Sequence, residues 1–281
     1  LHVRGRPLVM GILNITPDSF SDGGLSLDSA VAVSRAEQMV SEGADLIDIG
    51  GESTRPGSTG VSLAEELRRT IPVIRRLAKA VRVPLSIDTS KADVAERALD
   101  AGASIVNDVT ALQGDPRMAD VGVAAKAYVI LMHMRGTPQT MQEAPQYMDV
   151  VAEVVQELQA SLKIASQAGI APDKILVDPG IGFGKTLAHN MDLLQRLMEF
   201  KSLLSKPVVV GPSRKAFIGK LLDVPVAERD EGTAAVVAFA IAEGADIVRV
   251  HDVKMMARIS KMTDYLVRVP ATALNERKAE S

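Results

Sequence analysis

Three stretches of the chain repeat one pattern: "SEGADLIDI" at residues 41–49, "DAGASIVND" at 100–108 and "AEGADIVRV" at 242–250. In each, the end of a helical segment is followed by a glycine and then by a short apolar run. Glycine is the usual residue just past a helix, because it adopts the left-handed conformation without a steric penalty. The pattern therefore predicts, in three separate places, a helix that ends shortly before a strand.

Apolar runs of this kind recur along the whole chain, with segments of helical spacing such as 90–102 and 150–169 between them. The candidate strands are residues 8–14, 45–50, 84–88, 104–108, 128–133, 175–179, 207–211 and 246–251. Their continuous Val, Ile and Leu content is typical of strands buried on both faces of a parallel sheet. Eight strands alternating with about eight helices predict an α/β fold, a (β/α)8 TIM barrel, with a doubly wound sheet as the alternative.

No shift in composition marks a domain boundary, so we expect a single domain over residues 1–281, with a frayed C-terminal tail at 275–281. The segments 14–27, 51–62 and 134–147 exceed the usual length of a connection. Long segments without regular structure in a compact domain are usually functional or disordered. We expect 14–27 and 51–62 to be mobile active-site loops.

The composition excludes several classes of protein. The 32 basic and 35 acidic residues give a net charge of −3, which argues against a general binder of nucleic acid or of anionic membranes. There is no cysteine, so disulfide and thiolate chemistry are excluded. The longest apolar run, 234–242, is too short to span a bilayer, and the first residues do not resemble a signal peptide. We expect a cytoplasmic protein.

Polar side chains follow every candidate strand, where the active sites of (β/α)8 barrels lie. They are Asn14, the segment 50–58, Asp88, Asn107 with Asp108, His133, Asp178, the segment 212–215, and Arg249 with His251. One aspartate after one strand would be explained as a helix N-cap. Eight strand ends of this kind indicate a site, with a structural ion-pair network around the rim as the alternative.

The residue types predict the chemistry of the ligand. Acceptors at Asp88, Asn107 and Asp178 suit a flat heterocycle rich in N–H donors. The cations Arg55, Arg214, Lys215 and Arg249, with His251 as a further candidate, suit phosphate groups. Hard oxygen ligands for Mg²⁺ are available at Asn14, Asp18 and Asp22, whereas no histidine pair or thiolate favours zinc. The stretch "GFGKT" at 182–186 lacks the spacing of a P-loop.

Eight motifs in this order resemble the dihydropteroate synthase family of the folate pathway. They are "GILNITPDSFSDGG", "DIGGESTRPGS", "SIDT", "NDV", "LMHMRG", "DPGIGFGK", "SRK" and "RVHDV", and the resemblance covers about residues 8–260. It implies a (β/α)8 barrel that condenses 6-hydroxymethyl-7,8-dihydropterin diphosphate with p-aminobenzoate, giving 7,8-dihydropteroate and pyrophosphate. It also implies Mg²⁺ as cofactor, a homodimer and inhibition by sulfonamides.

The resemblance assigns roles to individual residues. The pterin ligands it implies are Asp88, Asn107, Met132, Asp178, Lys215 and Arg249. Diphosphate contacts are implied for Asn14, Thr54, Arg55, Arg249 and His251. Phe20, Pro56, Phe183, Arg214 and Lys215 are implied to surround p-aminobenzoate. Mg²⁺ is implied to bind Asn14, with Asp18 or Asp22 as additional candidates. The residues expected to carry catalysis are Asp88, Lys215, Arg249 and His251. Relatives often have serine after "SRK", where this chain has Ala216.

The implied mechanism is dissociative: pyrophosphate leaves first, and the amine then attacks the resulting pterin cation. Closure of the two long loops would exclude water, and it would give Phe20 an apolar role in a polar segment. Two alternatives stay open from the sequence. One is a methyltetrahydrofolate-dependent methyltransferase, and the other is a paralogue that binds pterin without catalysis.

Overall fold

Eight parallel strands form one sheet in the computed structural model, which describes residues 5–15, 24–55 and 57–268. The strands are β1 (Leu8–Asn14), β2 (Leu46–Gly50), β3 (Leu85–Asp88), β4 (Ile105–Asp108), β5 (Tyr128–Met132), β6 (Ile175–Asp178), β7 (Val209–Val210) and β8 (Ile247–Val250). Each lies within one of the predicted runs. Their order in the sheet is β6-β5-β4-β3-β2-β1-β8-β7.

The sheet closes on itself. β1 pairs with both β2 and β8, so the first and last strands are neighbours. A parallel bridge between Val177 and Val208 joins β6 to the start of β7, and the Val177 N–H donates to the Pro207 carbonyl at 3.0 Å. The predicted (β/α)8 barrel is confirmed, because a doubly wound sheet would leave two open edges.

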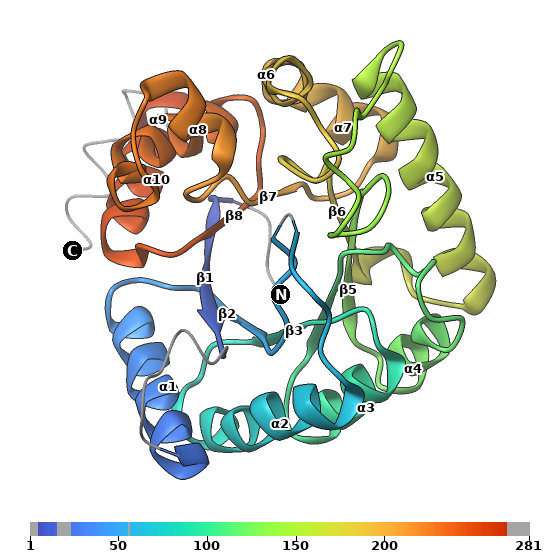
Figure 1. Cartoon of the computed structure of the whole chain (residues 1–281), viewed down its shortest axis with the longest axis vertical. Helices are drawn as coiled ribbons and strands as arrows, with labels where there is room; N and C mark the ends of the chain where they lie inside the picture. The colour runs from blue at the N-terminus through green and yellow to red at the C-terminus, as the bar shows by residue number, and fades with distance from the viewer. Residues whose placement is uncertain (1–4, 16–23, 56, 269–281) are drawn as a thin grey trace.

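Helices surround the strands (Figure 1). In chain order they are α1 (Gly24–Ser41), α2 (Leu63–Ala80), α3 (Ala92–Asp100), α4 (Met118–Ala124), α5 (Val150–Ala168), α6 (Leu187–Gln195), α7 (Leu197–Leu204), α8 (Ala216–Leu222), α9 (Asp230–Ala242) and α10 (Val253–Arg268), with short 3-10 turns η2 (Pro172–Lys174) and η3 (Val226–Glu228). Strands β6 and β7 are each followed by two helices rather than one. The break between α6 and α7 falls at Arg196, whose φ of −113° and ψ of 25° are not helical.

The repeated glycine pattern has the predicted role. Gly43, Gly102 and Gly244 follow α1, α3 and α9 with φ of 109°, 117° and 96°. A Cβ on Gly102 would also lie 2.5 Å from the Cβ of Ala78, so no larger residue fits there. At these positions the sequence fixes where a helix stops and the next strand begins.

Alternation along the strands separates the two faces of the barrel wall. The interior is filled by a cluster of buried side chains that is separate from the core between the strands and the helices: Leu8, Met10, Leu46, Ile105, Ile130, Leu176, Val209 and Ile247. Two residues further along the same strands, the interior-facing positions are Ile12, Asp48, Asn107, Met132, Asp178, Gly211 and Arg249. The interior is thus apolar in one layer and mainly polar in the next, toward the C-terminal ends.

The structure revises one loop boundary. Helix α1 begins at Gly24, so residues 24–27 are helical and do not belong to the predicted loop 14–27. The predicted loop 51–62 ends as expected, because Ser62 caps α2 by accepting from the Glu65 N–H. The remaining part of the first loop, at 16–23, and the tail at 275–281 lie outside the described residues. Within the described ranges, no helix is long and apolar enough to cross a membrane.

Candidate active site

Arg249 is at the centre of the polar layer. Its Nε donates to Asp48 Oδ2 at 2.6 Å, and its Nη2 donates to Asp88 Oδ2 at 2.7 Å. The same oxygen of Asp48 accepts from Asn107 Nδ2 at 3.0 Å. Four strands, β2, β3, β4 and β8, therefore bring one guanidinium, one amide and two carboxylates into a single hydrogen-bonded group.

Asp48 is a site residue that the sequence reasoning missed. It is fully buried and lies inside the motif "DIGGESTRPGS", yet it received no role because it is not at the strand end. Alternation could have identified it, since a residue two positions before Gly50 faces the same interior. An acidic residue at such a position of a buried parallel strand needs a partner, and Arg249 is that partner.

A second polar group lies on the opposite wall, at the end of β6. Asp178 Oδ1 accepts the Gly180 N–H at 2.7 Å. Burial raises the pKa of Asp178, while the nearby Lys215 and the Gly180 N–H act to lower it. Asp178 pairs in register with Met132 of β5, and both are buried. An apolar side chain thus lies beside a buried acceptor, as a flat polar ring requires.

Lys215 follows β7 and reaches the same wall. Its ammonium group donates to the Ile181 carbonyl and lies 4.4 Å from the centre of the Phe183 ring. Burial lowers the pKa of Lys215 to about 8, with Asp178 opposing the shift. Gly182 has φ of +84°, and a Cβ there would lie 2.9 Å from Lys215 Cδ. The glycine therefore leaves the space in which the lysine stem runs.

His251 is neutral, which corrects its provisional place among the cations. The Ser213 hydroxyl oxygen lies 2.9 Å from His251 Nδ1 and also accepts the His251 backbone N–H at 3.2 Å. Ser213 thus contacts His251 at both Nδ1 and the backbone N–H, and in the tautomer whose Nδ1 accepts from the Ser213 hydroxyl the ring proton is on Nε2. Burial, together with the charges of Arg249, Arg214 and Arg55, lowers the pKa of His251 to about 3. The ring can offer an N–H donor, but no positive charge at neutral pH.

The predicted magnesium ligand Asn14 ends β1 at the rim. Gly50, its register partner, lies between Asn14 and Asp88: a Cβ there would be 3.6 Å from Asn14 Oδ1 and 3.6 Å from Asp88 Cβ. No group of three acidic or histidine side chains suited to a metal occurs among the described residues. These residues fit a Mg²⁺ ion that takes few ligands from the protein and most of its ligands from substrate phosphates and water. Asp18 and Asp22, the other candidates, lie outside the described residues.

The loop after β2 carries Thr54 and the exposed Arg55. It is tied to the loop after β5, because the Gly57 N–H donates to the Pro138 carbonyl at 2.9 Å. The hydroxyl of Ser58 also donates to the Ser53 carbonyl at 2.5 Å. The charge of Arg55 acts to lower the pKa of His251, which follows β8. Phe20 and Pro56, the predicted neighbours of p-aminobenzoate, lie outside the described residues.

Arg214 is held away from the centre of the mouth. Its Nε and Nη2 donate to the two carboxylate oxygens of Asp230, at 2.8 and 2.7 Å. Its backbone has φ of +56°, and its N–H donates to the Thr233 hydroxyl at 3.0 Å. The predicted contact of Arg214 with p-aminobenzoate would require this side-on pair with α9 to open or to be shared.

Asp108, a polar strand end, is structural. One of its oxygens accepts from the backbone and hydroxyl of Thr110, and the other accepts from the Leu112 N–H. It therefore closes the turn after β4. It is not the helix N-cap considered in the sequence analysis, because the next helix, α4, begins only at Met118.

His133 and Lys185 form a buried pair behind the Phe183 loop. Lys185 Nζ lies 2.8 Å from His133 Nδ1 and donates to the Phe183 carbonyl at 2.9 Å. His133 Nε2 lies 2.9 Å from Glu157 Oε2. Burial and then the charge of Lys185 lower the pKa of His133 to about 4. The imidazole is thus neutral, accepts from Lys185 and donates to Glu157, which makes the pair a brace for the loop.

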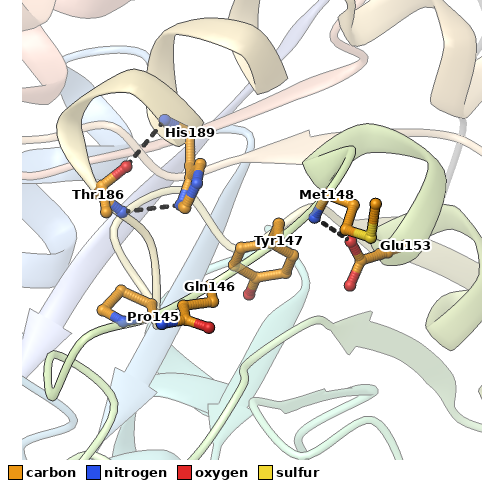
Figure 2. Close-up of a pocket in the computed structure, with 7 residues that line it drawn as sticks. All are labelled: Pro145, Gln146, Tyr147, Met148, Glu153, Thr186 and His189. Carbon is orange, nitrogen blue, oxygen red and sulfur yellow. Dashed lines mark hydrogen bonds between the residues drawn. The ribbon is translucent and has the colours of Figure 1, made fainter.

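A surface hollow of about 560 Å³ lies outside the barrel mouth, between the loop 145–148 and the start of α6 (Figure 2). Its polar groups are used within the chain: the Tyr147 hydroxyl donates to the Gly184 carbonyl at 3.0 Å, and the His189 N–H donates to the Thr186 hydroxyl at 3.2 Å. The residues that the sequence analysis predicted for the site do not line it.

The fold and the polar layer define a class of protein. It is a (β/α)8 barrel with buried carboxylate and amide oxygens on its inner wall and with N–H donors at the rim, as is typical of a barrel enzyme that binds a polar small molecule.

Comparison with known proteins agrees with this class. Residues 10–251 match the family described as "Pterin binding enzyme". Dihydropteroate synthase of Synechocystis sp. is 52% identical over 264 residues, which are 94% of this chain and 91% of that protein. The crystal structure of Yersinia pestis dihydropteroate synthase with a sulfonamide drug aligns with a TM-score of 0.89 at 45% identity, covering 95% of this chain and 96% of that one. Dihydropteroate synthase from Xanthomonas albilineans in complex with 7,8-dihydropteroate aligns with a TM-score of 0.86 at 42% identity, covering 96% of this chain and 97% of that one. The chain belongs to the dihydropteroate synthase family.

Proposed function

We propose that this chain joins 6-hydroxymethyl-7,8-dihydropterin diphosphate to p-aminobenzoate, releasing pyrophosphate, and that its residues carry the roles described below. The observation that carries the proposal is the contact of Arg249 with Asp48 and Asp88, with Asn107 bound to the same Asp48 oxygen. This contact supports the proposal because a guanidinium suited to a diphosphate lies directly beside carboxylate and amide oxygens suited to the N–H groups of a pterin ring.

The pterin ring is proposed to lie between Met132 and the acceptors of the polar layer. Asn107 uses its N–H group on Asp48, so its amide oxygen is left as an acceptor. Asp88 Oδ1 is buried and has no hydrogen-bond partner among the described residues. Asp178 keeps its second oxygen beyond the Gly180 contact. These oxygens suit the amino and N–H groups of the ring, and protonated Lys215 suits its carbonyl oxygen.

The diphosphate is proposed to meet Arg249, the Nε2–H of His251, and the loop that carries Thr54 and Arg55. Mg²⁺ is proposed to bind the diphosphate together with Asn14, where it would neutralise charge on the departing group. Calorimetry tests the metal: Mg²⁺ should bind only when pyrophosphate is present, and Asn14→Ala should weaken that binding. Equal Mg²⁺ binding by both proteins would exclude Asn14.

Departure of pyrophosphate separates charge, and the arrangement suits both products. Arg249 and the His251 N–H are preorganised for the leaving anion, because Asp48 and Ser213 already orient them. Asp88 and Asp178 stabilise the pterin cation that remains. The amine of p-aminobenzoate can then attack without a strong base.

The second substrate is proposed to lie over Phe183 and Lys215, with Phe20 and Pro56 completing the slot. Support comes from the Phe183 ring, which lies 4.4 Å from the Lys215 ammonium group, while the Phe183 carbonyl accepts from Lys185. Sulfonamides are proposed to compete for this slot.

We also propose that two copies associate through α9 and α10. Large apolar side chains are exposed there, including Phe239, Met262 and Leu266 at 43%, 58% and 73% exposure. Exposed apolar groups of this size usually mark an interface, and two-fold dimers are the most common assembly. Sedimentation should give a dimer that Leu266→Glu converts to a monomer, and a monomeric native chain would contradict the proposal. The cytoplasmic location expected from the sequence stays a prediction.

One assay tests the proposed reaction. The chain is mixed with the pterin diphosphate, p-aminobenzoate and Mg²⁺, and both pyrophosphate and dihydropteroate are measured, with and without a sulfonamide. Equal amounts of both products, reduced by the sulfonamide, are expected. Pterin binding without pyrophosphate release would favour a non-catalytic binder.

A further inference from the structure

Asp48 orients Arg249 in the proposed reaction, and the same oxygen also contacts a second proposed site residue, Asn107. We propose that Asp48 is the positioning residue that holds Asn107 toward the pterin ring and Arg249 toward the diphosphate through a single oxygen, Oδ2. This rests on the proposed roles of Asn107 and Arg249.

The contact with Asn107 decides which way its amide faces. Only the Nδ2 group can donate to a carboxylate, and it does so to Asp48 Oδ2 at 3.0 Å. The Asn107 oxygen is thereby directed away from Asp48 and is available to the N–H donors of the ring. If the acceptor on Asp48 were lost, nothing among the described contacts of Asn107 would prevent its amide from turning over.

The contact with Arg249 differs from that of its second partner, Asp88. Asp48 is fully buried one layer deeper, whereas Asp88 is at the strand end and keeps 8% of its surface exposed. A ligand at the mouth can therefore take Asp88 from Arg249 but cannot reach Asp48. No described residue accepts from Arg249 Nη1. Once Nη2 has left Asp88, the guanidinium can therefore donate from both Nη1 and Nη2 to an anion, while its Nε remains hydrogen-bonded to Asp48.

The environment of the second oxygen of Asp48, Oδ1, indicates whether the charge of the carboxylate or the position of its acceptor oxygen is the more important property. Oδ1 is buried without a hydrogen-bond partner among the described residues, as is the hydroxyl of Ser86, the register partner of Asp48. In Asp48→Asn, the amide oxygen can take the place of Oδ2 and the amide N–H₂ the place of the unpaired Oδ1. The reverse orientation would put donors against donors. Asparagine should therefore preserve both contacts without the charge, whereas glutamate keeps the charge but moves the oxygens.

The test compares Asp48→Asn with Asp48→Glu. Asparagine should retain at least about a tenth of the wild-type kcat/KM for the pterin diphosphate. Glutamate should lose about 10²-fold, since a shift of about 1 Å in a positioned group costs that much. In both variants, the KM for p-aminobenzoate should change far less. An active Asp48→Glu beside an inactive Asp48→Asn, or wild-type kinetics in both, would overturn the proposal.

Asp108→Asn is the matched control. Asp108 is a fully buried carboxylate of the next strand but one, and its partners are Thr110 and Leu112 rather than site residues. Its loss should lower the melting temperature and leave both KM values unchanged. If it shifts the pterin KM as Asp48→Glu does, the effect of Asp48 is only structural and the proposal fails.

Calorimetry gives a reading independent of turnover and of the folding of the glutamate variant. Asp48→Asn should bind 6-hydroxymethylpterin within a few-fold of wild type, because Asn107 stays oriented. A loss beyond about tenfold would overturn the proposal. If wild-type protein releases no pyrophosphate while this binding result holds, the proposed reaction fails and the positioning of Asn107 stands.

Discussion

Arg249 Nη2 donates to Asp88 Oδ2 at 2.7 Å, which joins the residue proposed to receive the departing diphosphate to a residue proposed to hold the pterin. When the substrate binds, its diphosphate must compete with Asp88 for Arg249, and its pterin ring must replace Arg249 as the partner of Asp88. Both ends of the substrate are needed for that exchange. A pterin without its diphosphate should therefore bind with lower affinity than the pterin diphosphate.

Arg249→Ala should lower kcat by about 10²–10³-fold, because it removes a preorganised donor for the charge that develops on the leaving group. It also leaves Asp48 buried without its cation, so the free energy of unfolding should fall. Steady-state kinetics and thermal melting measure the two effects. Arg117→Ala, which breaks only exposed pairs with Asp93 and Glu96, is the control. A folded Arg249→Ala with wild-type kcat would assign Arg249 to stability alone.

Asp178→Asn should weaken binding of 6-hydroxymethylpterin by at least about tenfold. The new amide oxygen will stay on the Gly180 N–H, as Oδ1 does at 2.7 Å. The amide N–H₂ will then face the ring, where a donor meets donors. Calorimetry measures the affinity, and an unchanged value would remove Asp178 from the pterin site.

Lys215 should set the alkaline limb of the pH profile. Burial lowers its pKa to about 8, so its charge and one donor are lost as the pH rises through that value. The kcat/KM for the pterin diphosphate, which reports the free enzyme, should fall about tenfold per pH unit above pH 8. Lys215→Arg, which stays charged, should abolish this limb even if its rate is lower. The same limb in the arginine variant would assign the titration to another group.

Lys185→Met should raise the KM for p-aminobenzoate more than that for the pterin diphosphate. Methionine keeps much of the buried stem but leaves His133 Nδ1 and the Phe183 carbonyl without their donor. Leaving buried acceptors unpaired should also cost about 1–3 kcal/mol of stability. In the control Lys201→Met, a lysine that donates to Asp246 and the Gly244 carbonyl is lost, so stability should fall without a change in either KM. Equal KM changes for both substrates in Lys185→Met would deny the loop a specific role.

The sequence predicted the strands well because each carries its own local signal. Apolar runs of five to seven residues predicted the strands, and a glycine after each of three helices predicted the turns, so both follow from backbone geometry within a few residues. The extra helices after β6 and β7 and the start of α1 at Gly24 were not predicted, since no strong stop or cap signal marks them. The candidate site was predicted as a set of strand ends, which included the structural Asp108 and missed Asp48.

The sequence by itself determined which side chains reach the mouth of the barrel, because strand periodicity and parallel order place every strand end at one rim. Only the tertiary structure decided which partners those side chains have and which charge they carry. Arg249 meets Asp48 across 201 residues of chain, His251 is neutral because Ser213 and burial hold it so, and Lys215 has its pKa near 8 because its surroundings are buried. Charge state and pairing depend on distant neighbours and on the exclusion of water, and neither is written in any local stretch of the chain.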